Sequence, residues 1–95
     1  MRFPIARLLF APLRHRNRGL LTHGECTGRT IRIDPRSAVP ASTLLHEYLH
    51  LIYPSWSETR VRKEERKRWR RLSWRMKARL YQKLGRAQIE NEEDA

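Results

Sequence analysis

The chain has little cysteine, few acids and no long apolar run. Its single cysteine, Cys26, excludes a disulfide within the chain and suits a reducing compartment. No stretch approaches the roughly 18 consecutive apolar residues that a membrane-spanning helix needs. The apolar segment at the N-terminus is interrupted by Pro4 and Arg7, which argues against a signal peptide. We therefore expect one small domain in the cytoplasm, without insertion into a membrane.

The most informative pattern is His46–His50, in which two histidines four residues apart enclose a glutamate. On a helix, side chains at i and i+4 project from adjacent turns in the same direction, so both imidazoles can reach one metal ion. Glu47 lies about 100° round the helix from His46, beside the metal, where it can accept a proton from bound water. The surrounding residues are apolar, so we expect a buried helix in which a metal offsets the cost of burying these polar groups.

A catalytic zinc site needs a third protein ligand and an open position for water. Glu58 stands eight residues after His50. Pro54 ends the first helix, and Ser55 or Ser57 can cap the next one, so the chain turns back past the two histidines. This arrangement predicts that Glu58 completes the ligand set.

The segments before the motif favour short strands. Three runs are β-prone, and the last alternates so that its isoleucines share one face. Thr27 and Gly28, within the stretch Glu25–Gly28, are predicted to form the turn before that last strand. The expected fold is α+β, with a small antiparallel β-hairpin or three-stranded sheet packed on the motif helix. The three runs are Ile5–Phe10, Gly19–His23 and Arg29–Asp34.

Three segments, Thr30–Asp34, Thr43–His50 and Pro54–Glu58, together resemble the small HExxH proteins of the gluzincin type that are found in phages and prophages. The resemblance covers roughly residues 18–84. It implies a zinc metallopeptidase that hydrolyses a peptide or protein substrate in the cytoplasm of a bacterial or phage-infected cell. The strand Thr30–Asp34 is then expected to pair with extended substrate. The implied zinc ligands are His46, His50 and Glu58, with Glu47 as the catalytic base.

Other residues remain open for two of these roles. Glu64 and Glu65 are alternative third ligands, although in so basic a segment we expect them to pair with Arg and Lys. The family's larger members stabilise the transition state with a Tyr or His, and here Tyr53 and His23 are the only candidates. Metal binding is therefore better supported by the sequence than catalysis is.

Positive charge is concentrated in the C-terminal part of the chain. Residues 60–86 contain 13 Lys or Arg and two acids, so this segment has a net charge of 13 − 2 = +11. The formal net charge of the whole chain is also +11. The segment has no proline, and its only glycine, Gly85, can end a helix. We predict one helix from Ser57 to Leu84, a single domain over residues 1–86 and an acidic disordered tail over residues 87–95. The side of this predicted helix that faces the core is expected to carry Val61, Trp69, Leu72, Met76, Leu80 and Leu84.

A basic face with two aromatic residues is expected opposite this side. Such a face suits phosphate contacts and base stacking in nucleic acid, although an acidic protein or a membrane surface would also fit. Two functions therefore compete: a zinc metallopeptidase, which we favour, and a zinc-stabilised basic module that binds nucleic acid without catalysis. The predicted face consists of Lys63, Lys67, Arg70, Arg71, Trp74, Lys77 and Tyr81.

Overall fold

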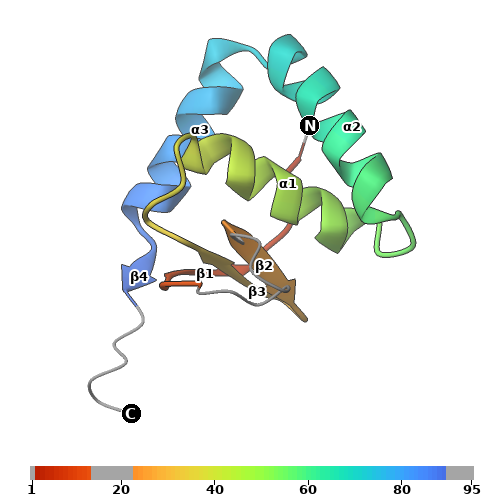
Figure 1. Ribbon diagram of the computed structural model, residues 1–95. Helices are drawn as coiled ribbons and strands as arrows, with labels where there is room; N and C mark the ends of the chain where they lie inside the picture. Colours follow the sequence, from red (N-terminus) through yellow and green to blue (C-terminus); the bar gives the residue numbers. More distant parts are fainter. Residues whose placement is uncertain (1, 14–22, 90–95) are drawn as a thin grey trace.

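A computed structural model describes residues 2–13 and 23–89. One four-stranded sheet lies on one side of the molecule and three helices cover its other side (Figure 1). The prediction of an α+β fold is confirmed. The elements are β1 (Arg7–Phe10), β2 (Gly24–Thr27), β3 (Thr30–Ile33), α1 (Pro40–Ile52), α2 (Glu58–Arg71), α3 (Trp74–Gly85) and β4 (Gln88–Ile89).

The sheet is mixed, and its strand order is β2-β3-β1-β4. β2 and β3 form an antiparallel hairpin across a tight turn at Gly28, whose φ of 59° lies in the left-handed region that glycine tolerates. β1 runs parallel to β3, with Arg7 opposite Thr30 and Phe10 opposite Ile33. The prediction of a purely antiparallel arrangement was therefore wrong. Parallel strands need no tight turn between them, so no local turn signal marks such a pair in the sequence.

Several strands and turns begin or end at other residues than predicted. Glu25 to Thr27, which we expected in a turn, belong to β2, and the turn lies one residue later. Gln88 and Ile89, predicted to be part of the tail, form β4 and pair with β1. Most of the predicted strand Gly19–His23, and residues 90–95 of the tail, lie outside the described residues.

The core lies between the sheet and α1. Pro40 begins α1 at a position where its missing N–H costs nothing, and the helix ends at Ile52, ahead of Pro54. One face of β3 packs against the buried, mainly apolar residues of α1, as the alternation of β3 and the apolar character of α1 predicted. α1 also contacts α2 and α3 on its other side. The buried core residues of these two elements are Ile31, Ile33, Ala41, Leu44, Leu45, Tyr48 and Leu49.

The C-terminal segment is two helices and not one. α2 ends at Arg71, Leu72 is extended, and Ser73 begins α3 by accepting a hydrogen bond from the Met76 N–H at 3.2 Å. The single helix predicted from Ser57 to Leu84 was therefore wrong. The break lets α3 return to α1 and bury Leu80, which a straight helix would carry away from the core.

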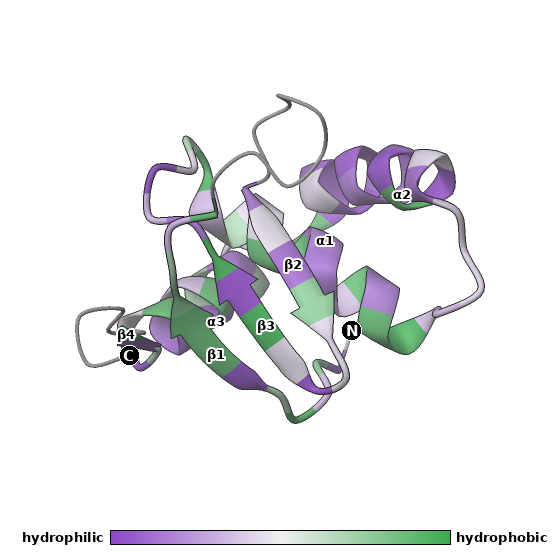
Figure 2. Ribbon diagram, turned by 60° about the horizontal axis from the view of Figure 1, so that its bottom comes forward, coloured by the Kyte–Doolittle hydropathy of each residue, from purple (hydrophilic) through white to green (hydrophobic). Residues whose placement is uncertain are grey.

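The three helices differ in how hydrophilic their residues are. Figure 2 shows the sheet in front of the helices and α2 as the most hydrophilic of the three. Within the described ranges, no helix combines the length and the apolar character needed to cross a membrane.

Candidate metal centre

Two helices and the turn between them build the site. α1 carries His46 and His50 on adjacent turns, with ring centroids 4.9 Å apart. The chain then turns at Pro54, and Ser57 caps α2 by accepting a hydrogen bond from the Arg60 N–H at 3.2 Å. Glu58 is consequently the first residue of α2, next to the two histidines.

The three side chains converge on one point. Glu58 bridges the histidines, with Oε1 2.6 Å from His46 Nε2 and Oε2 2.8 Å from His50 Nε2. One ligand atom from each residue lies within 4.8 Å of the other two. Tetrahedral zinc bonds of about 2.0–2.2 Å place ligand atoms about 3.4 Å apart, so a shift of under about 1 Å at Glu58 would open the group to an ion. His46, His50 and Glu58 can therefore hold a metal ion.

Glu65 holds the other nitrogen of His46. Its Oε1 lies 2.6 Å from His46 Nδ1, and its Oε2 accepts a hydrogen bond from Ser42 Oγ at 2.6 Å. The expectation that Glu65 pairs with Arg or Lys was wrong. A carboxylate on Nδ1 leaves Nε2 directed at the ligand point, as second-sphere carboxylates do in metal sites. The position of Glu65 beside the site could have been predicted from the sequence, because residues seven apart on a helix, such as Glu58 and Glu65, share one face.

Carboxylates on both ring nitrogens control the charge of His46. Burial alone would lower the pKa of His46, but the hydrogen bond that its Nδ1–H donates to Glu65 and the charges of Glu47, Glu58 and Glu65 raise it above its usual value. Burial likewise opposes ionisation of Glu65, and its hydrogen bonds to His46 and Ser42 outweigh this effect and lower its pKa. Without a metal, the carboxylates around His46 thus favour the protonated form of its imidazole.

Glu47 follows His46 on α1 and is only 5% exposed. Burial raises the pKa of Glu47 to about 7; His46 opposes this rise, and the carboxylates of Glu58 and Glu65 add to it. β2 passes close by: a Cβ atom at Gly24 would lie 3.0 Å from Glu47 Oε2 and 2.8 Å from Thr43 Cγ2. A glycine at this position is therefore needed for the sheet to approach Glu47, a requirement that the sequence did not reveal.

The remaining candidates lie elsewhere. Glu64 pairs with Arg68 at 3.5 Å, as expected for a basic helix. The ring of Tyr53 is stacked on Trp56 with centroids 3.9 Å apart. His23 is exposed. Among the described residues, neither Tyr53 nor His23 has a hydrogen bond to the three ligands, and the structure brings neither into the cluster.

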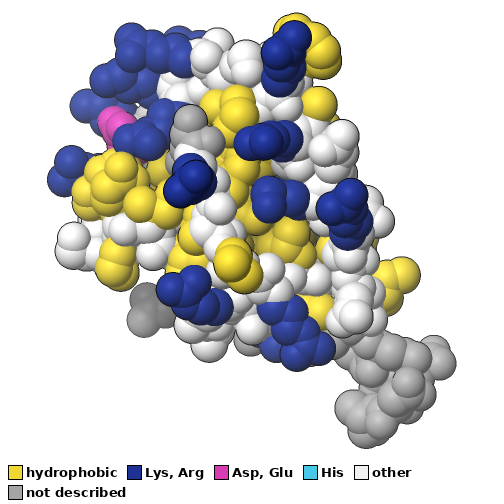
Figure 3. Space-filling model, turned by 180° about the vertical axis from the view of Figure 1, so that it is seen from behind, with side chains coloured by type: hydrophobic (Ala, Val, Ile, Leu, Met, Phe, Trp, Pro, Cys, Tyr) yellow, Lys and Arg dark blue, Asp and Glu magenta, His cyan; other side chains and the backbone are white. Residues whose placement is uncertain are grey.

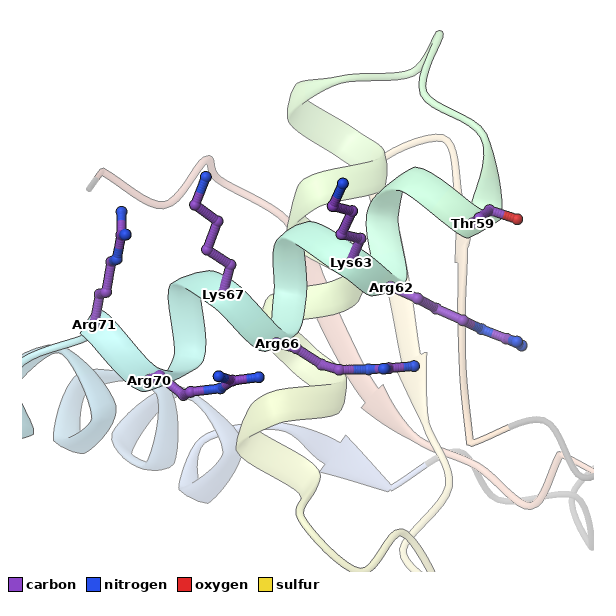
Figure 4. A pocket seen from close by; sticks show the side chains of 7 residues that line it. All are labelled: Thr59, Arg62, Lys63, Arg66, Lys67, Arg70 and Arg71. Atoms are coloured by element: carbon purple, nitrogen blue, oxygen red, sulfur yellow. The ribbon is translucent and has the colours of Figure 1, made fainter.

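The predicted basic face is divided between two helices. Lys63, Lys67, Arg70 and Arg71 are exposed on α2, whereas Trp74, Lys77 and Tyr81 belong to α3. Lys77 turns back over the ring of Trp69, with Nζ 4.7 Å from its centroid. The face that we predicted for one continuous helix was therefore wrong. Arg62 and Arg66, which were not predicted, line the same side of α2 as its other cations (Figure 4).

Comparisons with known proteins give no match: no family model, no curated protein and no solved structure is similar to this chain at the level of significance applied.

Proposed function

We propose that the protein is a zinc-dependent metallopeptidase. The observation that carries the proposal is the convergence of His46, His50 and Glu58 on one point, with the buried Glu47 following His46 on the same helix. Two imidazoles and one carboxylate are the ligand set of hydrolytic zinc sites that keep the fourth position open for water. The resemblance to small HExxH proteins of the gluzincin type agrees with this choice of metal and reaction.

Zinc, when bound, would polarise the scissile carbonyl and lower the pKa of bound water. Glu47 would accept the proton of that water and pass it to the leaving amine. Burial suits Glu47 to this task, because a carboxylate with little solvation has a greater affinity for a proton. Glu65 would keep the His46 ring oriented throughout.

Extended substrate would pair with β2 and not with Thr30–Asp34. β3 is an interior strand between β2 and β1, so its main-chain groups are already used. β2 is the strand at the edge of the sheet, and its residue Gly24 lies against Glu47. Substrate added at this edge would gain main-chain hydrogen bonds close to the catalytic base.

The test compares the purified chain with Glu47→Gln. Glutamine keeps the shape of the side chain but cannot act as a base, so cleavage of an unfolded protein substrate should fall by at least about 100-fold while zinc content is unchanged. Glu64→Gln is the matched control, since Glu64 is an acid on α2 that pairs only with Arg68 among the described residues. If both variants cleave like the original chain, the proposal is wrong. A zinc-loaded chain without any cleavage would instead support the alternative, in which the metal only stabilises a basic module.

A further inference from the structure

The solvent face of α2 carries six cationic side chains, which are spread along the length of the helix. Together with Thr59 they border an open groove of about 600 Å³. All six side chains are exposed, and no acid lines this groove (Figure 4). The six are Arg62, Lys63, Arg66, Lys67, Arg70 and Arg71.

These side chains form two rows. Lys63, Lys67 and Arg71 leave the helix in one direction, and a second row leaves it about 100° away round the helix axis (Figure 4). Within each row the residues are four apart, so charges recur about every 6 Å and a row extends about 12 Å along the helix. One strand of duplex DNA presents a phosphate about every 3.4 Å of its axis, so a row spans about four phosphates and its three cations can contact three of them. The second row is Arg62, Arg66 and Arg70.

The two rows are free to meet a partner. α2 directs Glu58, Val61 and Glu65 toward α1, and the centre of the cationic face is roughly 140° away from these residues. Arg62 contacts Glu58 at 3.5 Å. Within the described part of the chain, the other five cations have no ion pair with a carboxylate. Binding at this face would therefore break few existing contacts.

We propose that α2 binds duplex DNA by lying in the major groove, with one row of cations on the phosphates of each strand. An α-helix with its side chains is about 10–12 Å across, and the major groove of B-DNA is about 12 Å wide. In this placement the cations contact phosphates and not base edges, so the face binds the backbone without sequence preference. The major groove of duplex RNA is too narrow for this mode. Arg62 contacts the candidate metal ligand Glu58, and the binding expected at this face does not depend on catalysis.

Net charge alone is the competing explanation. Figure 3 shows Lys and Arg side chains spread over the reverse face of the molecule as well. A chain with a formal charge of +11 attracts any polyanion weakly. The proposal therefore requires that cations on α2 matter more than equal charges elsewhere.

The experiment measures binding of the full zinc-loaded chain to a fluorescent 20-bp DNA duplex of arbitrary sequence between 50 and 200 mM salt. Six phosphate contacts predict a slope of about −5 for log K against log salt. The double variant Lys67→Gln, Arg70→Gln removes one cation from each row, so the slope should fall in magnitude to about −3.5 and the affinity by tenfold or more. Gln keeps helix propensity close to that of Lys and Arg.

The matched control is Arg75→Gln, Arg79→Gln, which removes two exposed cations from α3. It should change the affinity by less than twofold and leave the slope in place. The corresponding single strand offers phosphates to only one row, so it should bind more weakly and with about half the slope. Equal losses in the two double variants would overturn the proposal in favour of net charge. The proposal would also be overturned if the single strand, duplex RNA or phosphatidylserine vesicles bound the chain as tightly as the DNA duplex does. Absence of binding to the DNA duplex at 50 mM salt would overturn it as well.

Discussion

Glu65 on α2 and His46 on α1 are joined by a 2.6 Å contact between Oε1 and Nδ1, and this contact decides which nitrogen of the ring faces Glu58. Glu65→Ala should therefore weaken zinc binding by about 10- to 100-fold, the usual effect of losing a second-sphere partner. Competition with a chromophoric chelator measures this affinity directly.

The control for this variant is Glu64→Ala, which removes a neighbouring acid that contacts Arg68 and not the histidines. Its zinc affinity should match that of the original chain. Equal affinities in all three proteins would show that Glu65 does not position His46.

Metal binding should stabilise the fold, because the ligands come together only in the folded chain. At free zinc of 100 times Kd, the gain is about 2.7 kcal/mol, or on the order of 10 °C or more in Tm for a domain of this size. Chelation should reverse the gain, and His50→Ala should abolish both the zinc and the response to the chelator. His23→Ala is the matched control, since His23 is exposed and outside the cluster. A chelator that leaves the Tm of the original chain unchanged would contradict this prediction.

Gly24 permits β2 to approach the carboxylate of Glu47. In Gly24→Ala the added methyl group would be 2.8 Å from Thr43 Cγ2 and 3.0 Å from Glu47 Oε2, so the side chains must move. We expect a loss of about 1–3 kcal/mol in the free energy of unfolding, with reduced cleavage and retained zinc. Urea unfolding and metal analysis test these effects.

A second glycine provides the comparison. A methyl group at Gly85, at the end of α3, would have no atom within 4 Å. Gly85→Ala should be neutral or stabilising by up to about 1 kcal/mol. If the two glycine variants unfold alike and cleave alike, the close approach at Gly24 has no functional consequence.

The sequence predicted the ligand cluster better than the sheet. His46 and His50 are linked to each other by helical spacing alone, and Pro54 with Ser57 determines where α2 starts. These are local rules. The pairing of β1 with β3 joins residues 23 apart without a local signal, so composition and alternation could show which side of β3 is buried but not which strands flank it.

The helix break shows a different limit. The segment from Glu58 onward lacks proline and internal glycine, so helix propensity gave no reason to stop at Leu72. Ser73 was the only local mark, since a serine can cap a new helix. What favours the break is the burial of Leu80 against α1, a tertiary contact that no pattern within the segment specifies.

Asp34 should make the fold sensitive to acid. Its buried carboxylate accepts hydrogen bonds from the Leu13 N–H at 3.0 Å and from the Arg36 side chain at 2.9 Å, and the bonds to Arg36 hold its pKa well below the usual range. The folded chain therefore binds fewer protons at this site than the unfolded chain. Its stabilising effect is complete above the unfolded pKa of about 3.9 and is lost as the pH falls toward the folded value.

Asp34→Asn removes the charge but keeps one acceptor. At pH 7 the metal-free variant should be less stable than the original chain by about 1.5–3 kcal/mol, the scale of hydrogen bonds to an ionised group. Below about pH 4 this difference should shrink, because the unfolded original chain then gains a proton at Asp34 while the folded chain does not, which lowers the stability of the original chain. Urea unfolding with a chelator present at pH 7, 5 and 3 measures the difference while excluding zinc release.

Glu64→Gln, which removes a surface ion pair to Arg68, should change stability by less than about 1 kcal/mol at every pH. A deficit in Asp34→Asn that stays constant from pH 7 to 3 would show that the charge of Asp34 does not stabilise the fold.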